Sequence, residues 1–111
     1  MTADLIRQEA ARAFYRYANE FAEARLTEWK MGSGASSVQP ILTHLLNAEE
    51  ALDQAIMRLT MLSKYDQHEL LLPLDGRPVF FSKQLLVGLR IKITDRREQF
   101  SIIENILRGR P

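Results

Sequence analysis

The 111-residue sequence contains no cysteine, and this absence excludes two classes of structure. Without thiols the chain can form no disulfide bond, and it has no thiolate to offer a structural metal site. Disulfides persist in oxidising compartments, so a cysteine-free composition agrees with the reducing cytoplasm. We therefore expect a cytoplasmic protein.

Long hydrophobic runs are also missing. Charged residues interrupt every apolar segment before it reaches the length of about 20 residues that a transmembrane helix needs. The N-terminal segment carries Asp4 and Arg7 and has no apolar run of signal-peptide length. We expect a protein that neither enters a membrane nor is exported by a cleaved signal.

What the sequence does contain is typical of one globular domain. Apolar residues make up 46% and charged residues 26% of the chain, which is the composition of a protein with a packed core. The length suits a single core rather than two. We predict one helical domain over residues 1–111.

The strongest pattern is a row of seven apolar residues whose spacings alternate between four and three. This spacing marks the side of a helix that packs against another helix. The row consists of Ile41, Leu45, Ala48, Leu52, Ala55, Leu59 and Leu62. Its two alanines indicate a closely packed neighbour. Because no member can donate or accept a hydrogen bond, the row indicates packing or binding rather than chemistry.

The remaining segments complete a mainly α fold. We predict an antiparallel bundle of three main helices with a short β-hairpin near residues 70–81, where Asp75 and Gly76 form a strong turn signal. Pro73 and Pro78 limit this segment to a small edge hairpin or a packed loop. The predicted elements are helix 4–31, linker 32–39, helix 40–66, loop or hairpin 67–81 and helix 82–108.

The last predicted helix leaves two questions open. Apolar residues at heptad spacing favour a continuous helix, but residues 89–94 alternate as a strand does, and the helix can break near residues 94–95. A continuous helix turns Arg96 inward, where it needs an acidic partner such as Glu20, Glu23 or Glu28. A break leaves Arg96 in solvent.

Few residues suggest catalysis or metal binding. His44 and His68 have no histidine or acid at the spacing of a helical metal pair, and a histidine beside a helix interface is ordinary. Glu49, Glu50 and Asp53 point mainly to the outer face of helix 40–66, which predicts a solvated surface. We therefore expect no catalytic residue, no metal and no cofactor.

Charge is distributed unevenly along the chain. Residues 1–76 carry seven basic and eleven acidic side chains, a balance of −4, and residues 77–111 carry eight basic and three acidic side chains, a balance of +5. The two regions can pack or oligomerise against each other, which is the interpretation we favour. The alternative is an acidic partner or nucleic acid at the C-terminal region.

Two sets of residues are candidates for partner binding. The first is an adaptable apolar stripe on helix 40–66, and the second is the set of C-terminal arginines, of which Arg90, Arg97 and Arg108 share one face. The candidates are Leu46, Met57, Met61, Arg90, Arg96, Arg97 and Arg108.

These features predict a small non-enzymatic interaction protein that binds a protein partner through helical surfaces. It would act as a chaperone, an adaptor or an assembly subunit. A homodimer is the expected form, because the apolar side of helix 4–31 is wider than one neighbouring helix needs. The alternative function is a small regulator that binds nucleic acid through its basic C-terminal segment.

Overall fold

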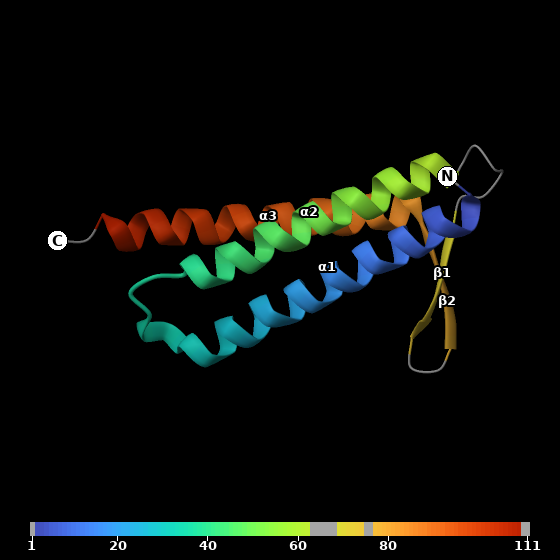
Figure 1. The fold of residues 1–111 in the computed structure, drawn as a ribbon. Coiled ribbons are helices and arrows are strands. Elements are labelled where there is room, and N and C mark those ends of the chain that lie inside the picture. The colour runs from blue at the N-terminus through green and yellow to red at the C-terminus, as the bar shows by residue number, and fades with distance from the viewer. Residues whose placement is uncertain (1, 63–68, 75–76, 110–111) are drawn as a thin grey trace.

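The computed structural model describes residues 2–62, 69–74 and 77–109. It confirms the predicted mainly α fold, an antiparallel bundle of three long helices with a short β-hairpin (Figure 1). Helices α1 and α2 run antiparallel, and α3 returns alongside α2 in the opposite direction (Figure 1). The elements are α1 (Ala3–Met31), a short 3₁₀ turn (Gly32–Gly34), α2 (Gln39–Leu62), β1 (Glu69–Leu74), β2 (Arg77–Ser82) and α3 (Lys83–Arg108).

Local signals in the sequence set the helix ends. The hydroxyl of Thr2 accepts a hydrogen bond from the backbone N–H of Leu5 at 3.3 Å and so caps α1. At the other end Gly32 has a φ of 65°, a conformation that suits glycine and ends the helix. Helix α2 follows the predicted helix 40–66 as far as Leu62, and residues 63–66 lie outside the described residues.

Helix α3 is continuous through residues 94–95, so the prediction of one helix over residues 82–108 is confirmed. The alternative of a strand followed by a helix is wrong. The Ser82 hydroxyl caps the helix by accepting the N–H of Leu85 at 3.1 Å. Leu86, Ile93 and Phe100, seven residues apart, are all buried on one side. Packing of this heptad against α2 outweighs the local strand-like alternation.

The predicted hairpin is present as two antiparallel six-residue strands, although its turn at residues 75–76 lies outside the described residues. Pro73 and Pro78 are paired directly, next to the closing pair of Leu74 and Arg77. In such a hairpin the closing pair is hydrogen-bonded and the next pair is not. The two prolines therefore occupy positions where no ladder hydrogen bond is lost.

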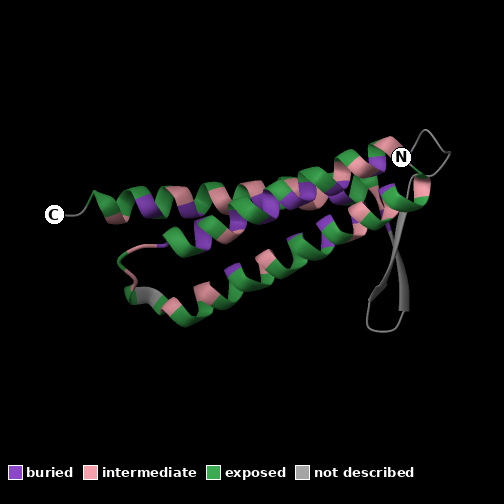
Figure 2. Cartoon of the chain, in the orientation of Figure 1, coloured by how far each residue is buried: buried purple, intermediate pink, exposed green. Residues whose placement is uncertain are grey.

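The core follows the row of seven apolar residues on α2. Each is at most 2% exposed, and Figure 2 shows the buried positions gathered where the helices meet. Arg58 and His44 on one flank of the row contact α1, whereas Glu49 and Asp53 on the other flank contact α3. The row is thus an internal seam between two neighbours.

The hairpin is joined to the bundle by an aromatic contact. The ring of Phe81, the second-last residue of β2, lies against Phe14 of α1 with 4.4 Å between ring centroids. Both side chains are buried.

None of the described helices combines the length and the apolar character that a membrane span requires.

Candidate functional site

Helix α3 is held to α2 by a buried carboxylate. Glu49 is only 6% exposed, and it forms ion pairs with Arg90, at 3.1 Å, and with Arg97. Arg90 also binds Asp53 at 2.7 Å, and this hydrogen bond is the main cause that raises the pKa of Arg90. The expectation that Glu49 lies on a solvated outer face is therefore wrong, because α3 covers that flank of α2.

A second buried carboxylate joins the C-terminal part of α3 to the start of α2. Glu104 is 4% exposed and accepts hydrogen bonds from the Ser37 hydroxyl at 2.8 Å and from the Val38 N–H at 2.8 Å. The hydrogen bond from Ser37 is the main cause that lowers the pKa of Glu104. An anion at a helix N-terminus also interacts favourably with the helix dipole. Glu104 thus caps α2 from a different helix.

The C-terminal arginines singled out by the sequence are all beside carboxylates of this chain. Arg90 and Arg97 contact Glu49, and Arg108 lies 3.6 Å from Glu104. Arg96 pairs with Glu28 of α1, one of the three acids expected for it on a continuous helix. These four side chains therefore do not form one free basic surface.

The predicted apolar stripe on α2 is not brought together either. Leu46 and Met57 are exposed on the outer face of α2, but they stand eleven residues apart with Glu50 and Asp53 between them. Met61 is partly buried against the core, and its sulfur lies 3.6 Å from Arg58. The stripe consists of two separate exposed side chains and one packed side chain.

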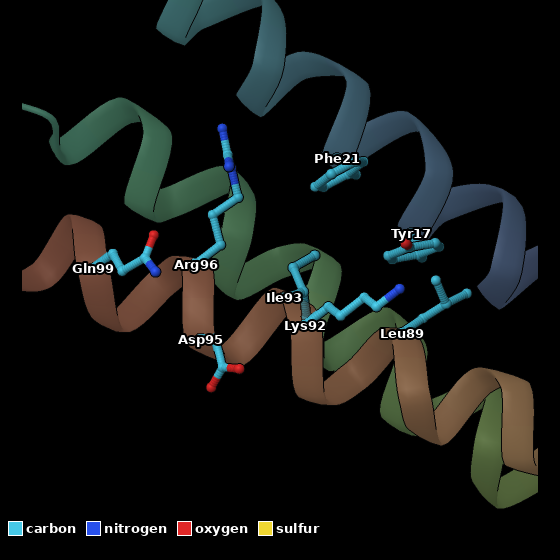
Figure 3. A pocket seen from close by; sticks show the side chains of 8 residues that line it. All are labelled: Tyr17, Phe21, Leu89, Lys92, Ile93, Asp95, Arg96 and Gln99. Carbon is cyan, nitrogen blue, oxygen red and sulfur yellow. The ribbon is translucent and has the colours of Figure 1, made fainter.

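A hollow lies between α1 and α3, and we call it the α1/α3 groove. It has a volume of about 420 Å³. Its lining comes from α1 and from residues 89–99 of α3, as Figure 3 shows. The lining residues are Tyr17, Phe21, Leu89, Lys92, Ile93, Asp95, Arg96 and Gln99.

The groove exists because α1 and α3 both pack on α2 but hardly on each other. Phe21 and Leu89 are only partly buried and form apolar walls. Tyr17 is buried, which raises the pKa of its hydroxyl. Among the described residues, no further element covers this apolar surface between α1 and α3.

Cations lie beside these apolar walls. Figure 3 shows the Lys92 side chain reaching toward Tyr17, and the Arg96 side chain reaching toward α1. The guanidinium of Arg96 lies 5.6 Å from the centre of the Phe100 ring, and that of Arg25 lies 6.0 Å from the centre of the Phe21 ring. Within the described residues, neither Lys92 nor Arg25 has a carboxylate partner.

A smaller hollow of about 270 Å³ lies beyond the Arg96–Glu28 ion pair, between the C-terminal turns of α1 and of α3. Its lining includes Met31, Phe100, Ile103 and Leu107, and it is mainly apolar. The α1/α3 side of the molecule thus offers two apolar hollows separated by an ion pair. A partner that covers both would contact cations between two apolar ends.

The described residues offer little for catalysis. His44 lies between α1 and α2, with its Nδ1 at 2.7 Å from a carboxylate oxygen of Glu20, so it serves the helix interface as expected. His68 lies outside the described residues. Among the described residues, no group of three or more histidine, aspartate or glutamate side chains could hold a metal ion.

Neither the groove nor Glu104 was among the candidates that the sequence suggested. One signal for the groove was present, because the apolar side of helix 4–31 exceeds the width that one neighbour covers. A signal for Glu104 was its spacing of four from Phe100, which places an acid on the buried side of α3.

Comparisons with protein-family models, with curated proteins and with solved structures found no match for this chain.

Proposed function

We propose that this chain is a small non-enzymatic interaction protein of the cytoplasm, an adaptor, chaperone or assembly subunit, whose α1/α3 groove binds a helix of a protein partner. One observation carries the proposal. Helices α1 and α3 leave between them a hollow of about 420 Å³ with walls of Tyr17, Phe21 and Leu89. An apolar groove between two helices suits the apolar side of a third helix.

The charges near the groove support a protein partner. Lys92 and Arg25 lie close to the apolar walls without a carboxylate partner among the described residues. Side chains of this kind select an acidic residue on a bound helix and disfavour a basic one, which gives specificity beyond apolar contact. The groove combines apolar walls for affinity with cations for selection.

Nucleic-acid binding has less support. A nucleic-acid interface needs several free cations that contact phosphates, and its affinity falls steeply with salt. Arg90, Arg96, Arg97 and Arg108 lie beside carboxylates of the same chain, so most of the basic residues of α3 are already neutralised. This alternative remains a prediction, and an electrophoretic mobility shift at low and high salt would test it.

Site-specific photo-crosslinking in cells tests the proposed function. A benzophenone amino acid replaces Gln99, which lines the groove, or Asn47, which is exposed at a polar hollow between α1 and α2. We expect a discrete crosslinked product from position 99 and none from position 47. Adding Phe21→Asp to the position 99 variant should remove the product. Equal products from both positions, or a product that Phe21→Asp does not change, would contradict the proposal.

A further inference from the structure

The solvent side of α3 carries an unusual row of residues, which we call the outer stripe. The spacings four, four, three, four and four place its six members on one face of the helix. The members are Val87, Ile91, Asp95, Glu98, Ile102 and Ile106. All six are exposed, including Ile91 at 59%, Ile102 at 60% and Ile106 at 56%. A solvent-facing stripe is normally polar, whereas two thirds of this one is apolar.

The two acids in the middle of the outer stripe lack partners. Within the described part of the chain, neither Asp95 nor Glu98 has an ion pair or a side-chain hydrogen bond. Figure 3 shows the Asp95 carboxylate pointing away from Tyr17 and Phe21. The outer stripe therefore presents two carboxylates between apolar ends. Asp95 stands at the edge that the stripe shares with the α1/α3 groove, whereas Glu98 is not among the residues that line the groove.

The outer stripe and the α1/α3 groove have complementary chemistry. The groove has apolar walls with Lys92 and Arg25 beside them, and the smaller apolar hollow continues it toward the C-terminal end of α3. Acids at the centre of the stripe match these cations, and isoleucines on either side match the apolar walls. Helices that dock in grooves use residues at such three- and four-residue spacings as anchors.

We propose that the occupant of the α1/α3 groove is the outer stripe of α3 from a second copy of this chain, an inference that rests on the proposed function of the groove as a helix-binding site. One contact between two copies then covers both the groove and the outer stripe. It also brings the stripe acids of one copy close to Lys92 and Arg25 of the other. A foreign helix would cover the groove alone and would leave Ile91, Ile102 and Ile106 in water. The second copy accounts for more of the exposed apolar surface.

The proposed contact joins two different surfaces, so it is heterologous. Each copy can present its stripe to one neighbour and receive the stripe of another. Such contacts produce open chains, or closed rings if the rotation between neighbours allows closure. The assembly therefore differs from the symmetric homodimer expected from the sequence, in which both copies use the same surface.

Sedimentation velocity of the purified chain from about 1 μM to about 1 mM tests the inference, because this range covers weak and moderate dissociation constants. We expect the mass to rise above the monomer value of 12.8 kDa with concentration. The groove variant Arg25→Glu with Lys92→Glu, and the stripe variant Glu98→Lys, should each associate at least tenfold more weakly. Like charges then meet at the contact.

An equimolar mixture of the two variants gives the sharpest result. The cationic stripe of one variant meets the anionic groove of the other, and the remaining stripe and groove are native, so association should return to near the wild-type level. The matched controls change exposed charges elsewhere, namely Arg12→Glu with Arg16→Glu for the groove variant and Glu50→Lys for the stripe variant. We expect the controls to associate as the wild type does, and circular dichroism verifies that every variant is folded.

Three results would overturn the inference: a wild-type chain that stays monomeric at about 1 mM, charge variants that associate like their controls, or a mixture that stays monomeric. If the reversed-charge stripe variant does not fold, Glu98→Gln repeats the test and should also weaken association. A monomeric chain whose groove is crosslinked to a different protein in cells would reject the second copy and keep the proposed function. Loss of the groove-specific crosslink would reject the proposed function itself.

Discussion

The two sides of α1 that meet other helices are built differently. Toward α2 it presents Ala10, Ala13 and Ala24, all buried, opposite a row that itself contains Ala48 and Ala55. Small side chains let two helix backbones approach closely. Hollows of about 240 Å³ and 210 Å³ on this side lie mainly among long polar side chains at the edges of the interface. Toward α3 the same helix presents aromatic rings and meets long cationic side chains.

On the α1/α3 side, the two helices do not pack closely against each other. Phe21 of α1 faces Lys92 and Arg96 of α3 across a hollow of about 420 Å³. Long charged side chains keep their ends in water, so they do not fill the space as leucine would. Side-chain size and charge, rather than the number of apolar residues, therefore decide whether two neighbouring helices of this bundle pack closely against each other.

The largest expected effect comes from truncating a leucine in the buried apolar row of α2. Leu52 is fully buried, so Leu52→Ala should lower the free energy of unfolding by about 2–5 kcal/mol through lost burial and a residual cavity. Urea denaturation followed by circular dichroism measures the change. The matched control Leu46→Ala truncates an exposed leucine on the same helix and should change the free energy by less than about 0.5 kcal/mol. Equal losses would show that the seam is not the main core.

The next largest effect tests the α2/α3 interface. Glu49→Gln keeps the shape of the side chain but removes the charge that pairs with Arg90 and Arg97. Because this carboxylate is buried and the arginines are partly solvated, we expect a loss of about 2 kcal/mol in the free energy of unfolding. Glu50→Gln, at the exposed neighbouring position, is the control and should change little. A stable Glu49→Gln variant would mean that apolar packing alone holds α3.

A smaller effect with a defined pH dependence is expected at Glu104. Its pKa is lower in the folded chain than the ordinary 4.5, so the ionised form stabilises the fold at neutral pH. That stabilisation is lost as the pH falls below 4.5 and through the folded pKa. The melting temperature of Glu104→Gln should therefore be lower than that of the wild type near neutral pH, and the two should converge in acid. Glu50→Gln, an exposed change on α2, controls for general charge effects.

A gap in melting temperature between Glu104→Gln and the wild type that stays constant from neutral to acid pH would contradict the assignment of Glu104 as an ionised cap. The expected convergence depends only on the charge of this carboxylate, because Gln retains an oxygen that can accept one hydrogen bond.

The smallest effect on stability is expected on the outer stripe. Ile102 is 60% exposed, so Ile102→Gln should change the free energy of unfolding by less than about 0.5 kcal/mol at a concentration where the chain is monomeric. Urea denaturation at about 1 μM protein measures this value, a concentration at which weak association is negligible. A loss comparable to that of Leu52→Ala would show that Ile102 belongs to the core and not to a docking surface.

Much of the fold was predictable because local patterns and tertiary packing agree. The seven-residue row on α2 is buried as expected, and the Ser82 hydroxyl caps α3 near the predicted start of the last helix. The uneven charge along the chain also has its simplest explanation in the fold, because Arg90, Arg96 and Arg97 of α3 pair with carboxylates of α1 and α2. The basic region packs against the acidic one, as the favoured interpretation predicts.

The candidate site was less predictable, since it depends on the distance between two helices that are far apart in the sequence. The stripe of Leu46, Met57 and Met61 was chosen from periodicity, which shows that residues share a face but not which neighbour covers it. Glu49 was assigned to solvent for the same reason. The error at Glu49 comes from the position of α3, which no local pattern on α2 reveals.

The sequence by itself determined where three helices and a hairpin form, because spacing, caps and turn residues act within a few residues of one another. It also determined the buried row of α2, since no alternative face of that helix is as apolar. Only the tertiary structure decided that α1 and α3 stand apart, that Glu49 and Glu104 are buried and paired, and that a groove lies beside cations without a carboxylate partner among the described residues. These properties arise from residues far apart in the sequence, such as Glu49 and Arg97, 48 residues apart, and Val38 and Glu104, 66 residues apart, or from gaps between helices that pack on a common neighbour.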